Sequence, residues 1–251
     1  MIQINNVSKW YGEFQVLTDC TTEVKKGEVV VVCGPSGSGK STLIKTVNAL
    51  EPFQKGEILV EGVSVGDPKT NLPKLRSRVG MVFQHFELFP HLSITDNLII
   101  AQMKVLGRGR DEAMEKGLKL LDRVGLKAHA HKFPGQLSGG QQQRIAIVRA
   151  LCMNPQVMLF DEVTAALDPE MVQEVLEVIR DLAGSGMTLL IVTHELAFAQ
   201  AVADRIVFMD GGHILEQTAP HQFFDNPRSQ RARQFLAKFS YTTVSKRKES
   251  A

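Results

Sequence analysis

The sequence predicts an α/β protein with a mostly parallel β-sheet that is covered by helices on both faces. Two kinds of segment alternate along the chain: short runs rich in β-branched residues, and longer stretches in which apolar residues recur at helical spacing. Strands that alternate with helices favour this architecture. The beginning of the chain is rich in β-type segments and its middle is helical, so we expect an antiparallel β flank and a helical insertion in addition to the core.

Three runs are expected to be buried parallel strands, because all of their residues are apolar and show no alternation with polar ones. They are residues 29–32, 157–160 and 189–192. Residues 1–30 and 56–66 instead favour antiparallel strands. The turn signals in these two regions are Gly12, Gly27, Gly56 and Gly62.

Two segments show clear helical periodicity. In the first, Met114, Leu118, Leu121 and Val124 fall on one face of a helix. The second is expected to begin after Asp168, a residue type favoured at the N-cap, with Pro169 in the first helical position. Its apolar stripe consists of Met171, Val172, Val175, Leu176, Ile179 and Leu182.

Length and charge restrict the organisation and the partners. A chain of 251 residues, 43% of them hydrophobic, fits one large domain. We expect that domain at residues 1–240, with a helical subdomain inserted at about 86–150 and a polar basic tail at 241–251. The 29 basic and 27 acidic residues are mixed along the chain, which gives no support for nucleic-acid binding. The tail, with Lys246-Arg247-Lys248, is expected to be a solvated end rather than a lipid-binding patch.

The cysteines and the hydropathy indicate a reducing compartment. Cys20, Cys33 and Cys152 are widely separated and lie among apolar residues, which is typical of buried thiols. No stretch approaches the roughly 18 apolar residues that a membrane helix needs, and the first ten residues lack the apolar segment of a signal peptide. We therefore expect a cytoplasmic protein that is soluble or bound peripherally to a membrane.

A glycine-rich loop follows the first buried strand and opens a helix. Loops of this composition curl so that successive backbone N–H groups point at a phosphate, and the helix N-terminus adds partial positive charge. Lys40 is placed to reach the β- and γ-phosphates, and the Ser41 hydroxyl to bind Mg²⁺. The sequence thus predicts the core of a P-loop NTPase that binds ATP with Mg²⁺. The nucleotide-binding residues are Gly34, Pro35, Ser36, Gly37, Ser38, Gly39, Lys40, Ser41 and Thr42.

Two acids, Asp161 and Glu162, follow the second buried strand directly. Ligands bind at the carboxyl ends of strands in open α/β sheets, so these carboxylates are expected beside the phosphates. Asp161 suits a role in holding Mg²⁺, and Glu162 suits that of the general base that polarises the attacking water.

A second candidate anion-binding helix start is the turn Ser138-Gly139-Gly140. It lies about a hundred residues after the glycine-rich loop. If two chains pair head to tail, the loop of each chain faces this turn of the other, and two ATP molecules are enclosed at a symmetric interface.

With these motifs, residues 1 to about 240 resemble the ATP-binding cassette (ABC) family. The resemblance implies the ABC ATPase fold, ATP hydrolysis and a homodimer in the ATP-bound state. It also implies roles for four further residues. Tyr11 would stack on adenine, Gln84 would bind the metal and link it to the membrane partners, His194 would sense the γ-phosphate, and Asp168 would lie at the subunit interface. Without the resemblance, Tyr11 is more typical of a core aromatic residue and His194 of a histidine at a strand end.

The chain carries a single cassette, with no fused membrane segment, as do the ATPase subunits of bacterial importers. The segments Lys9–Gly12 and Phe86–Ser93 resemble those of polar amino-acid importers. Phe14–Cys20 and Ser77–Glu87 resemble segments of the ATPases that serve glutamate/aspartate importers, which implies these two substrates. Cassettes for glutamine, arginine or histidine, and a non-transport ATPase, remain alternatives. The implied partners are transmembrane permease subunits and, indirectly, a substrate-binding protein, at the cytoplasmic face of the inner membrane.

Two positions depart from the family pattern. Val163 and Ala165 stand where a proline and a serine are usual. Val163 restores an N–H and some backbone freedom after the catalytic acid, and Ala165 removes a hydroxyl near the expected interface. Both carboxylates and Asp168 remain, so we expect an active enzyme.

Overall fold

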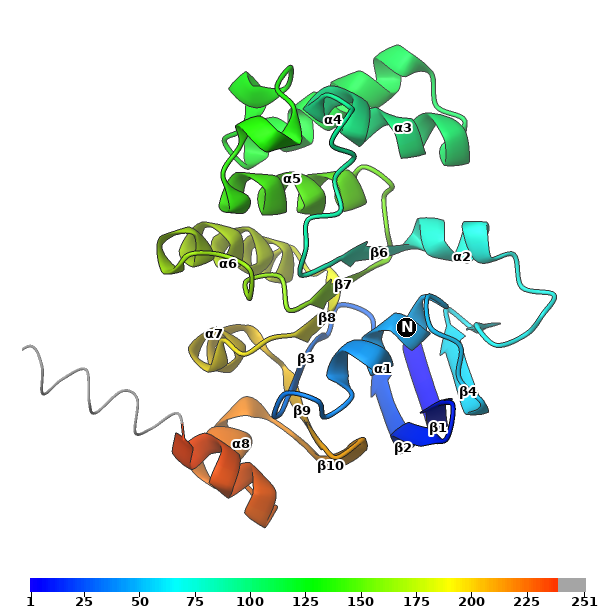
Figure 1. Cartoon of the computed structure of the whole chain (residues 1–251), viewed down its shortest axis with the longest axis vertical. Helices are drawn as coiled ribbons and strands as arrows, with labels where there is room; N and C mark the ends of the chain where they lie inside the picture. Colours follow the sequence, from blue (N-terminus) through cyan, green and yellow to red (C-terminus); the bar gives the residue numbers. More distant parts are fainter. Residues whose placement is uncertain (239–251) are drawn as a thin grey trace, which may run out of the picture.

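The computed structural model describes residues 1–238, so the predicted basic tail at 241–251 lies outside the described residues. The larger of two sheets has the strand order β10-β9-β3-β8-β7-β6. Five of its strands are parallel, and the edge strand β10 pairs antiparallel with β9 (Figure 1). These strands are β3 (Val29–Cys33), β6 (Val79–Val82), β7 (Val157–Asp161), β8 (Thr188–Val192), β9 (Arg205–Asp210) and β10 (His213–Thr218).

The second sheet forms the antiparallel flank expected from the sequence. Its strand order is β2-β1-β4-β5, and every pairing in it is antiparallel. The strands are β1 (Ile2–Tyr11), β2 (Phe14–Val24), β4 (Lys55–Val60) and β5 (Val63–Ser64). Gly12 and Gly62 lie in the turns predicted for them.

The turn predicted at Gly56 is wrong, because this glycine lies inside β4. Its φ is +89°, and a Cβ at this position would lie 2.4 Å from the Asn6 carbonyl oxygen of β1. A glycine in a strand often marks such a close approach between backbones rather than a turn. Here the approach occurs where the register between β1 and β4 shifts.

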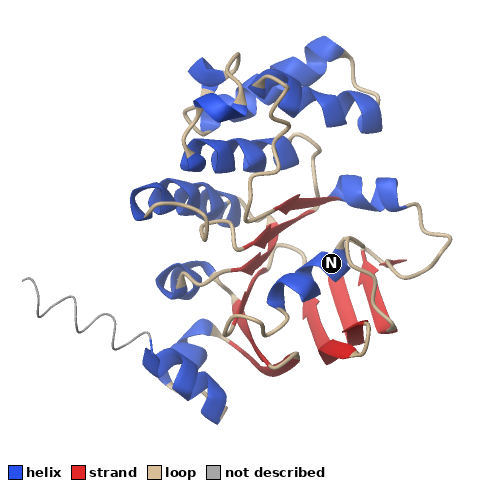
Figure 2. Cartoon of the chain, in the orientation of Figure 1, coloured by secondary structure: helices blue, strands red, loops and turns tan. Residues whose placement is uncertain are grey.

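Helices cover both faces of the larger sheet, as predicted (Figure 2). On one face, α1 packs with the antiparallel sheet; on the other, α5, α6 and α7 contribute to a separate apolar cluster. The helices are α1 (Lys40–Val47), α2 (Leu72–Arg78), α3 (Ile94–Leu106), α4 (Arg110–Arg123), α5 (Gly139–Leu151), α6 (Pro169–Gly184), α7 (Leu196–Val202) and α8 (Pro220–Asp225). Two 3₁₀ turns, η1 (Lys127–His129) and η2 (Pro134–Gln136), precede α5. Residues 230–238, the last that the structure describes, are also helical.

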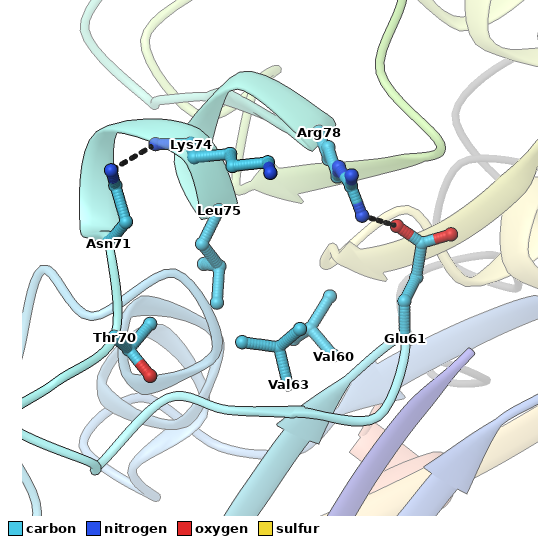
Figure 3. Close-up of a pocket in the computed structure, with 8 residues that line it drawn as sticks. All are labelled: Val60, Glu61, Val63, Thr70, Asn71, Lys74, Leu75 and Arg78. Carbon is cyan, nitrogen blue, oxygen red and sulfur yellow. Dashed lines mark hydrogen bonds and ion pairs between the residues drawn. The ribbon is translucent and has the colours of Figure 1, made fainter.

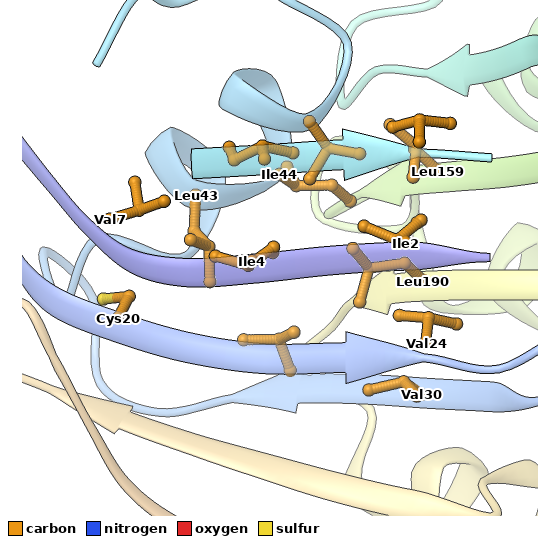
Figure 4. Close-up of a cluster of buried hydrophobic side chains, with 14 of the residues drawn as sticks. Ile2, Ile4, Val7, Cys20, Val24, Val30, Leu43, Ile44, Leu159 and Leu190 are labelled. Atoms are coloured by element: carbon orange, nitrogen blue, oxygen red, sulfur yellow. The ribbon is translucent and has the colours of Figure 1, made fainter. Parts of the chain in front are cut away.

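Alternation along the strands of the larger sheet divides the core in two. In β3, Val30 and Val32 face α1 and the antiparallel sheet, where they meet Ile2, Ile4, Leu43 and Ile44 (Figure 4). Val29, Val31 and Cys33 belong to the cluster on the opposite face. Each strand thus buries both of its faces, which explains its uninterrupted apolar sequence.

The helical region in the middle of the chain is attached through α5. Ala146 and Ile147 of α5 pack toward the sheet, whereas Ile145 and Val148 pack with Leu98 of α3 and other residues of a third cluster. All three cysteines are buried and free, and within residues 1–238 every helix is too short or too polar to cross a membrane.

Replacing Gly56 with Ala tests the close approach of β4 to β1. The added Cβ would clash with backbone and the positive φ disfavours alanine, so we expect a loss of about 2–4 kcal/mol in the free energy of unfolding. The matched control is Gly62→Ala, where φ is +77° but a Cβ would meet no described atom within 4 Å. This control should lose only about 1 kcal/mol. Urea denaturation measures the free energy of unfolding of both variants. Equal losses in the two would contradict a close approach of β4 to β1 at Gly56.

Candidate nucleotide site

Three adjacent strands of the larger sheet bring the predicted catalytic residues together. The strand β8 lies between β3 and β7, and Val192 at its end pairs with Val32 on one side and Asp161 on the other. The glycine-rich loop, the two acids and His194 therefore emerge side by side at the carboxyl edge of the sheet. In an open parallel sheet this edge is where ligands bind.

The glycine-rich loop folds tightly against neighbouring backbone. Gly34 has a φ of +147°, and a Cβ there would lie 2.0 Å from the Met209 carbonyl oxygen. Gly39, with a φ of +95°, is packed against Leu17 and Val16. The Ser38 hydroxyl is buried and has no hydrogen-bond partner in the part of the chain that the structure describes. A buried hydroxyl without a partner is uncommon, and it fits a loop that awaits a polar ligand.

Lys40 is the first residue of α1 and is almost entirely buried, with 3% of its side chain exposed. Its ammonium donates to the carbonyl oxygens of Gly34 and Pro35, at 3.1 and 3.0 Å, and lies 3.7 Å from the Glu162 carboxylate. Burial lowers the pKa of Lys40, and the Glu162 carboxylate opposes that shift. The ammonium thus sits between the glycine-rich loop and the acid.

Ser41 and Asp161 are joined by a direct hydrogen bond. The Ser41 hydroxyl donates to Asp161 Oδ1 at 2.6 Å, and the other carboxylate oxygen lies 3.5 Å from the Lys45 ammonium. A hydroxyl beside a carboxylate supplies the oxygen ligands that Mg²⁺ prefers. No larger cluster of acids, histidines and cysteines suited to a metal occurs within residues 1–238. The pair therefore fits a Mg²⁺ that is held partly by substrate phosphates.

Glu162 and His194 form the second polar pair. His194 Nε2 lies 3.0 Å from Glu162 Oε1, and the ring N–H donates, because an ionised carboxylate can only accept. The hydrogen bond from His194 is the largest cause of a lowered pKa at Glu162, to which the Lys40 ammonium adds. The Glu162 backbone has a positive φ of 50°, and its N–H donates to the Val192 carbonyl oxygen at 2.9 Å. The acid is thus ionised and held in place by β8.

The Ser138 turn opens α5 as predicted. The Ser138 hydroxyl accepts a hydrogen bond from the Gln141 N–H at 3.3 Å, and the Gln141 side chain accepts one from the Ser138 N–H, so the two form a capping box. The Gly140 N–H donates to Met171 Sδ at 3.3 Å. Since α1 and α5 pack on opposite faces of the sheet, one chain does not place this turn and the glycine-rich loop around one nucleotide.

The structure places the remaining predicted residues at the surface around this edge. Tyr11 ends β1 with 48% of its surface exposed, and Thr42 follows Ser41 in α1. Gln84 is half-buried and lies two residues after β6. Asp168 is exposed at the N-cap position of α6, but its side chain caps none of the described N–H groups.

Three supporting residues were missed in the sequence. Lys45 pairs with Asp161, and its spacing of four residues from Ser41 on one helix face could have revealed it. Gln143 Nε2 donates to the Phe83 carbonyl oxygen at 3.0 Å, and Arg149 donates to that of Glu87 at 2.6 Å. These two side chains of α5 thus bind both ends of the segment 83–87, which contains Gln84. No local pattern indicates these contacts, because they depend on packing.

A separate cavity of about 220 Å³ lies between α2 and the β4–β5 hairpin (Figure 3). Val60, Val63 and Leu75 form its apolar floor, and the Arg78–Glu61 ion pair closes one side at 3.4 Å. It contains none of the predicted site residues. The predicted site residues lie elsewhere, at the carboxyl edge of the larger sheet.

Comparison with known proteins agrees with this geometry. The pattern of the family described as "ABC transporter" matches residues 17–165, more than half of the chain. The chain belongs to the ABC transporter family. The match begins in β2 and ends just after the two acids, so it spans the glycine-rich loop and the Ser138 turn.

Individual relatives and a solved structure agree with this family assignment. The chain is 70% identical, over 238 residues, to the glutamate/aspartate import ATP-binding protein GltL of Escherichia coli K12; this covers 95% of the chain and 99% of the relative. It is 51% identical to the glutamine transport ATP-binding protein GlnQ of Geobacillus stearothermophilus, covering 95% and 98%. The dimeric post-hydrolysis structure of the ATP-binding cassette MJ0796, bound to ADP and phosphate, has a TM-score of 0.79 at 32% identity and covers 88% of this chain and 99% of that one. The ABC ATPase fold expected from the sequence is confirmed, and this ABC ATPase binds ATP.

Replacing His194 with Ala should raise the pKa of Glu162, because it removes the largest cause of the lowered value. Ionised Glu162 contributes stability that is present above its unfolded pKa of about 4.5 and is lost as the pH falls through its lower folded value. Part of this contribution should disappear in the variant. Carboxyl ¹³C NMR titration measures the pKa directly, with His213→Ala on the exposed edge strand as the control. An unchanged Glu162 pKa in His194→Ala would rule out the pairing.

Proposed function

We propose that this chain is the ATP-binding and ATP-hydrolysing subunit of a bacterial importer for polar amino acids, with glutamate and aspartate as substrates. The observation that carries the activity is the joint position of Lys40, the Ser41–Asp161 pair and the Glu162–His194 pair at one sheet edge. The substrates are suggested by the relative with 70% identity, which is named for glutamate/aspartate import. Glutamine, arginine and histidine remain the alternatives, and a relative with 51% identity is named for glutamine transport.

The loop residues and Tyr11 bind the nucleotide. Backbone N–H groups of residues 34–42, apart from Pro35, which has none, surround the phosphates. Lys40 turns from its own loop carbonyls to the β- and γ-phosphates, and Tyr11 stacks on adenine. Ser41, Asp161 and Gln84 would hold Mg²⁺, which would supply positive charge that offsets the negative charge of the phosphates.

Glu162 acts as the general base. Its lowered pKa keeps it ionised, so it can accept a proton from a water molecule while the water oxygen attacks the γ-phosphorus. The bond to the ADP oxygen breaks as this new bond forms. His194, fixed beside Glu162, holds the phosphate in position. Positioning and charge stabilisation account for most of the catalysis of phosphoryl transfer.

A second copy of the chain completes each site. Ser138, Gly139 and Gly140 of one copy face the γ-phosphate held by the other, and Asp168 lies at the same interface. The Gly140 N–H then exchanges a weak acceptor, Met171 Sδ, for a charged phosphate oxygen, which favours closure when ATP is present. Hydrolysis removes this partner, and the dimer reopens.

Residues 86–150 are proposed to act as the helical subdomain that passes this motion to permease subunits, within a domain that covers residues 1–240. The Gln84 segment is bound to α5 through Gln143 and Arg149, so α5 links the Ser138 turn to the segment that carries the metal-binding glutamine. Such a linked element can switch a partner between two states. The complex would lie at the cytoplasmic face of the inner membrane, with a substrate-binding protein acting on the permease.

Uptake of labelled glutamate, aspartate, glutamine, arginine and histidine tests the proposal. The host should lack the chain, or carry it as wild type or as Glu162→Gln. We expect acidic amino-acid uptake to fall at least tenfold on deletion and to return only with wild type, because the variant loses the base. Uptake of glutamine, arginine or histidine alone would correct the substrate. If no amino acid responds, the importer role fails.

The purified Glu162→Gln chain is the matched control for folding and binding. It should bind ATP as tightly as wild type or more tightly, since the phosphate-binding groups are unchanged, while its hydrolysis falls by a factor of about 100 or more. A gel-filtration shift with ATP reports the dimer. Hydrolysis at the wild-type rate would show that Glu162 is not the base.

A further inference from the structure

Lys9, a residue with no role in the nucleotide site described above, is buried beneath Tyr11. Only 2% of Lys9 is exposed, which is rare for a lysine. Its ammonium donates to the Pro52 carbonyl oxygen at 2.7 Å, pairs with Glu51 Oε2 at 3.1 Å and lies 4.2 Å from the centre of the Tyr11 ring. The positive charge of Lys9 is thus shielded from water but interacts with a carbonyl oxygen, a carboxylate and an aromatic ring.

The acid that pairs with Lys9 also acts on the tyrosine. Burial raises the pKa of Tyr11, and the nearby Glu51 carboxylate adds to that shift. The ammonium of Lys9 contacts the ring, and its ion pair with Glu51 holds the ammonium in that position. Despite these contacts, 48% of Tyr11 remains exposed.

An exposed aromatic ring that is anchored in this way is suited to stacking. A free tyrosine on a loop end loses side-chain entropy when a base stacks on it, whereas a ring held in advance does not. An ammonium over an aromatic ring is attracted to its electron-rich face, most strongly when the cation is desolvated. Lys9 meets this condition, because its ammonium is buried.

We propose that Lys9, together with Glu51, positions Tyr11 as the platform for the purine base of the nucleotide. Lys9 is a positioning residue in this account and touches neither the base nor the phosphates. The inference rests on the proposed nucleotide site, and it adds a requirement that is specific to the base: the Lys9 ammonium should matter for ATP and not for its phosphates alone.

Calorimetric titration of Lys9→Met with ATP and with inorganic tripolyphosphate tests the proposal. Methionine keeps an unbranched apolar stem and removes the charge, so we expect ATP to bind about threefold to tenfold more weakly. Tripolyphosphate should bind as it does to wild type. The matched control is Lys55→Met, because Lys55 lies 5.5 Å from the centre of the neighbouring Trp10 ring. This control should leave both affinities unchanged.

The Tyr11→Leu background separates positioning from general stability. Once the ring is gone, adding Lys9→Met should weaken ATP binding no further. If Lys9→Met folds poorly because Glu51 loses its partner, Lys9→Met with Glu51→Gln removes the unpaired carboxylate and permits the same titrations.

Three outcomes would overturn the inference: unchanged ATP affinity in Lys9→Met, equal losses for ATP and tripolyphosphate, or a full further loss in the Tyr11→Leu background. Failure of the wild-type chain to bind either ligand would instead reject the proposed nucleotide site. The two failures are therefore distinguishable.

Discussion

The parallel register of β3, β8 and β7 is the constraint on which the rest of the structure depends. All three strands are buried on both faces along their whole length, so polar side chains lie at their ends, as Thr188 and Asp161 do, or just beyond them. The pairing of Val192 with Val32 and with Asp161 brings those ends level. As a result, the glycine-rich loop, the acids and His194 meet at one edge although about 160 residues separate the first from the last. The antiparallel sheet packs with α1 in one apolar cluster on one face of the larger sheet.

The same architecture leaves a single chain incomplete. The sheet lies between α1 and α5, so the two helix starts suited to phosphate cannot converge within one copy. In the isolated chain two of the predicted phosphate-binding groups have a substitute partner: Lys40 bonds to its own loop carbonyls, and the Gly140 N–H to Met171 Sδ. These bonds satisfy buried donors but are weaker than bonds to a phosphate. ATP between two copies would replace both, which makes closure of the dimer depend on the nucleotide.

Much of the fold and of the site could be predicted from the sequence, because the decisive signals are local. The apolar strands, the glycine-rich loop and the acids after residue 160 occupy the expected places, and family membership confirms the architecture. The failures involve contacts between distant segments. Gly56 was expected in a turn because nothing in its neighbours reveals that Asn6 approaches it. The burial of Lys9 has no local sequence signal, because only the fold brings it beside Glu51 and Tyr11. The roles assigned to the site residues stay predictions until they are measured.

The central claim is that each ATP site is shared between two copies, and mixing two inactive variants tests it most directly. Lys40→Ala removes the phosphate-binding ammonium, and Ser138→Arg blocks the turn that faces the phosphate. Alone, each variant forms only sites with one defective half. In a mixture, a dimer of one copy of each pairs an intact loop with an intact turn. The account predicts that the mixture hydrolyses ATP faster than the sum of the separate variants, with a maximum near equal amounts. A rate equal to that sum at every ratio would contradict it.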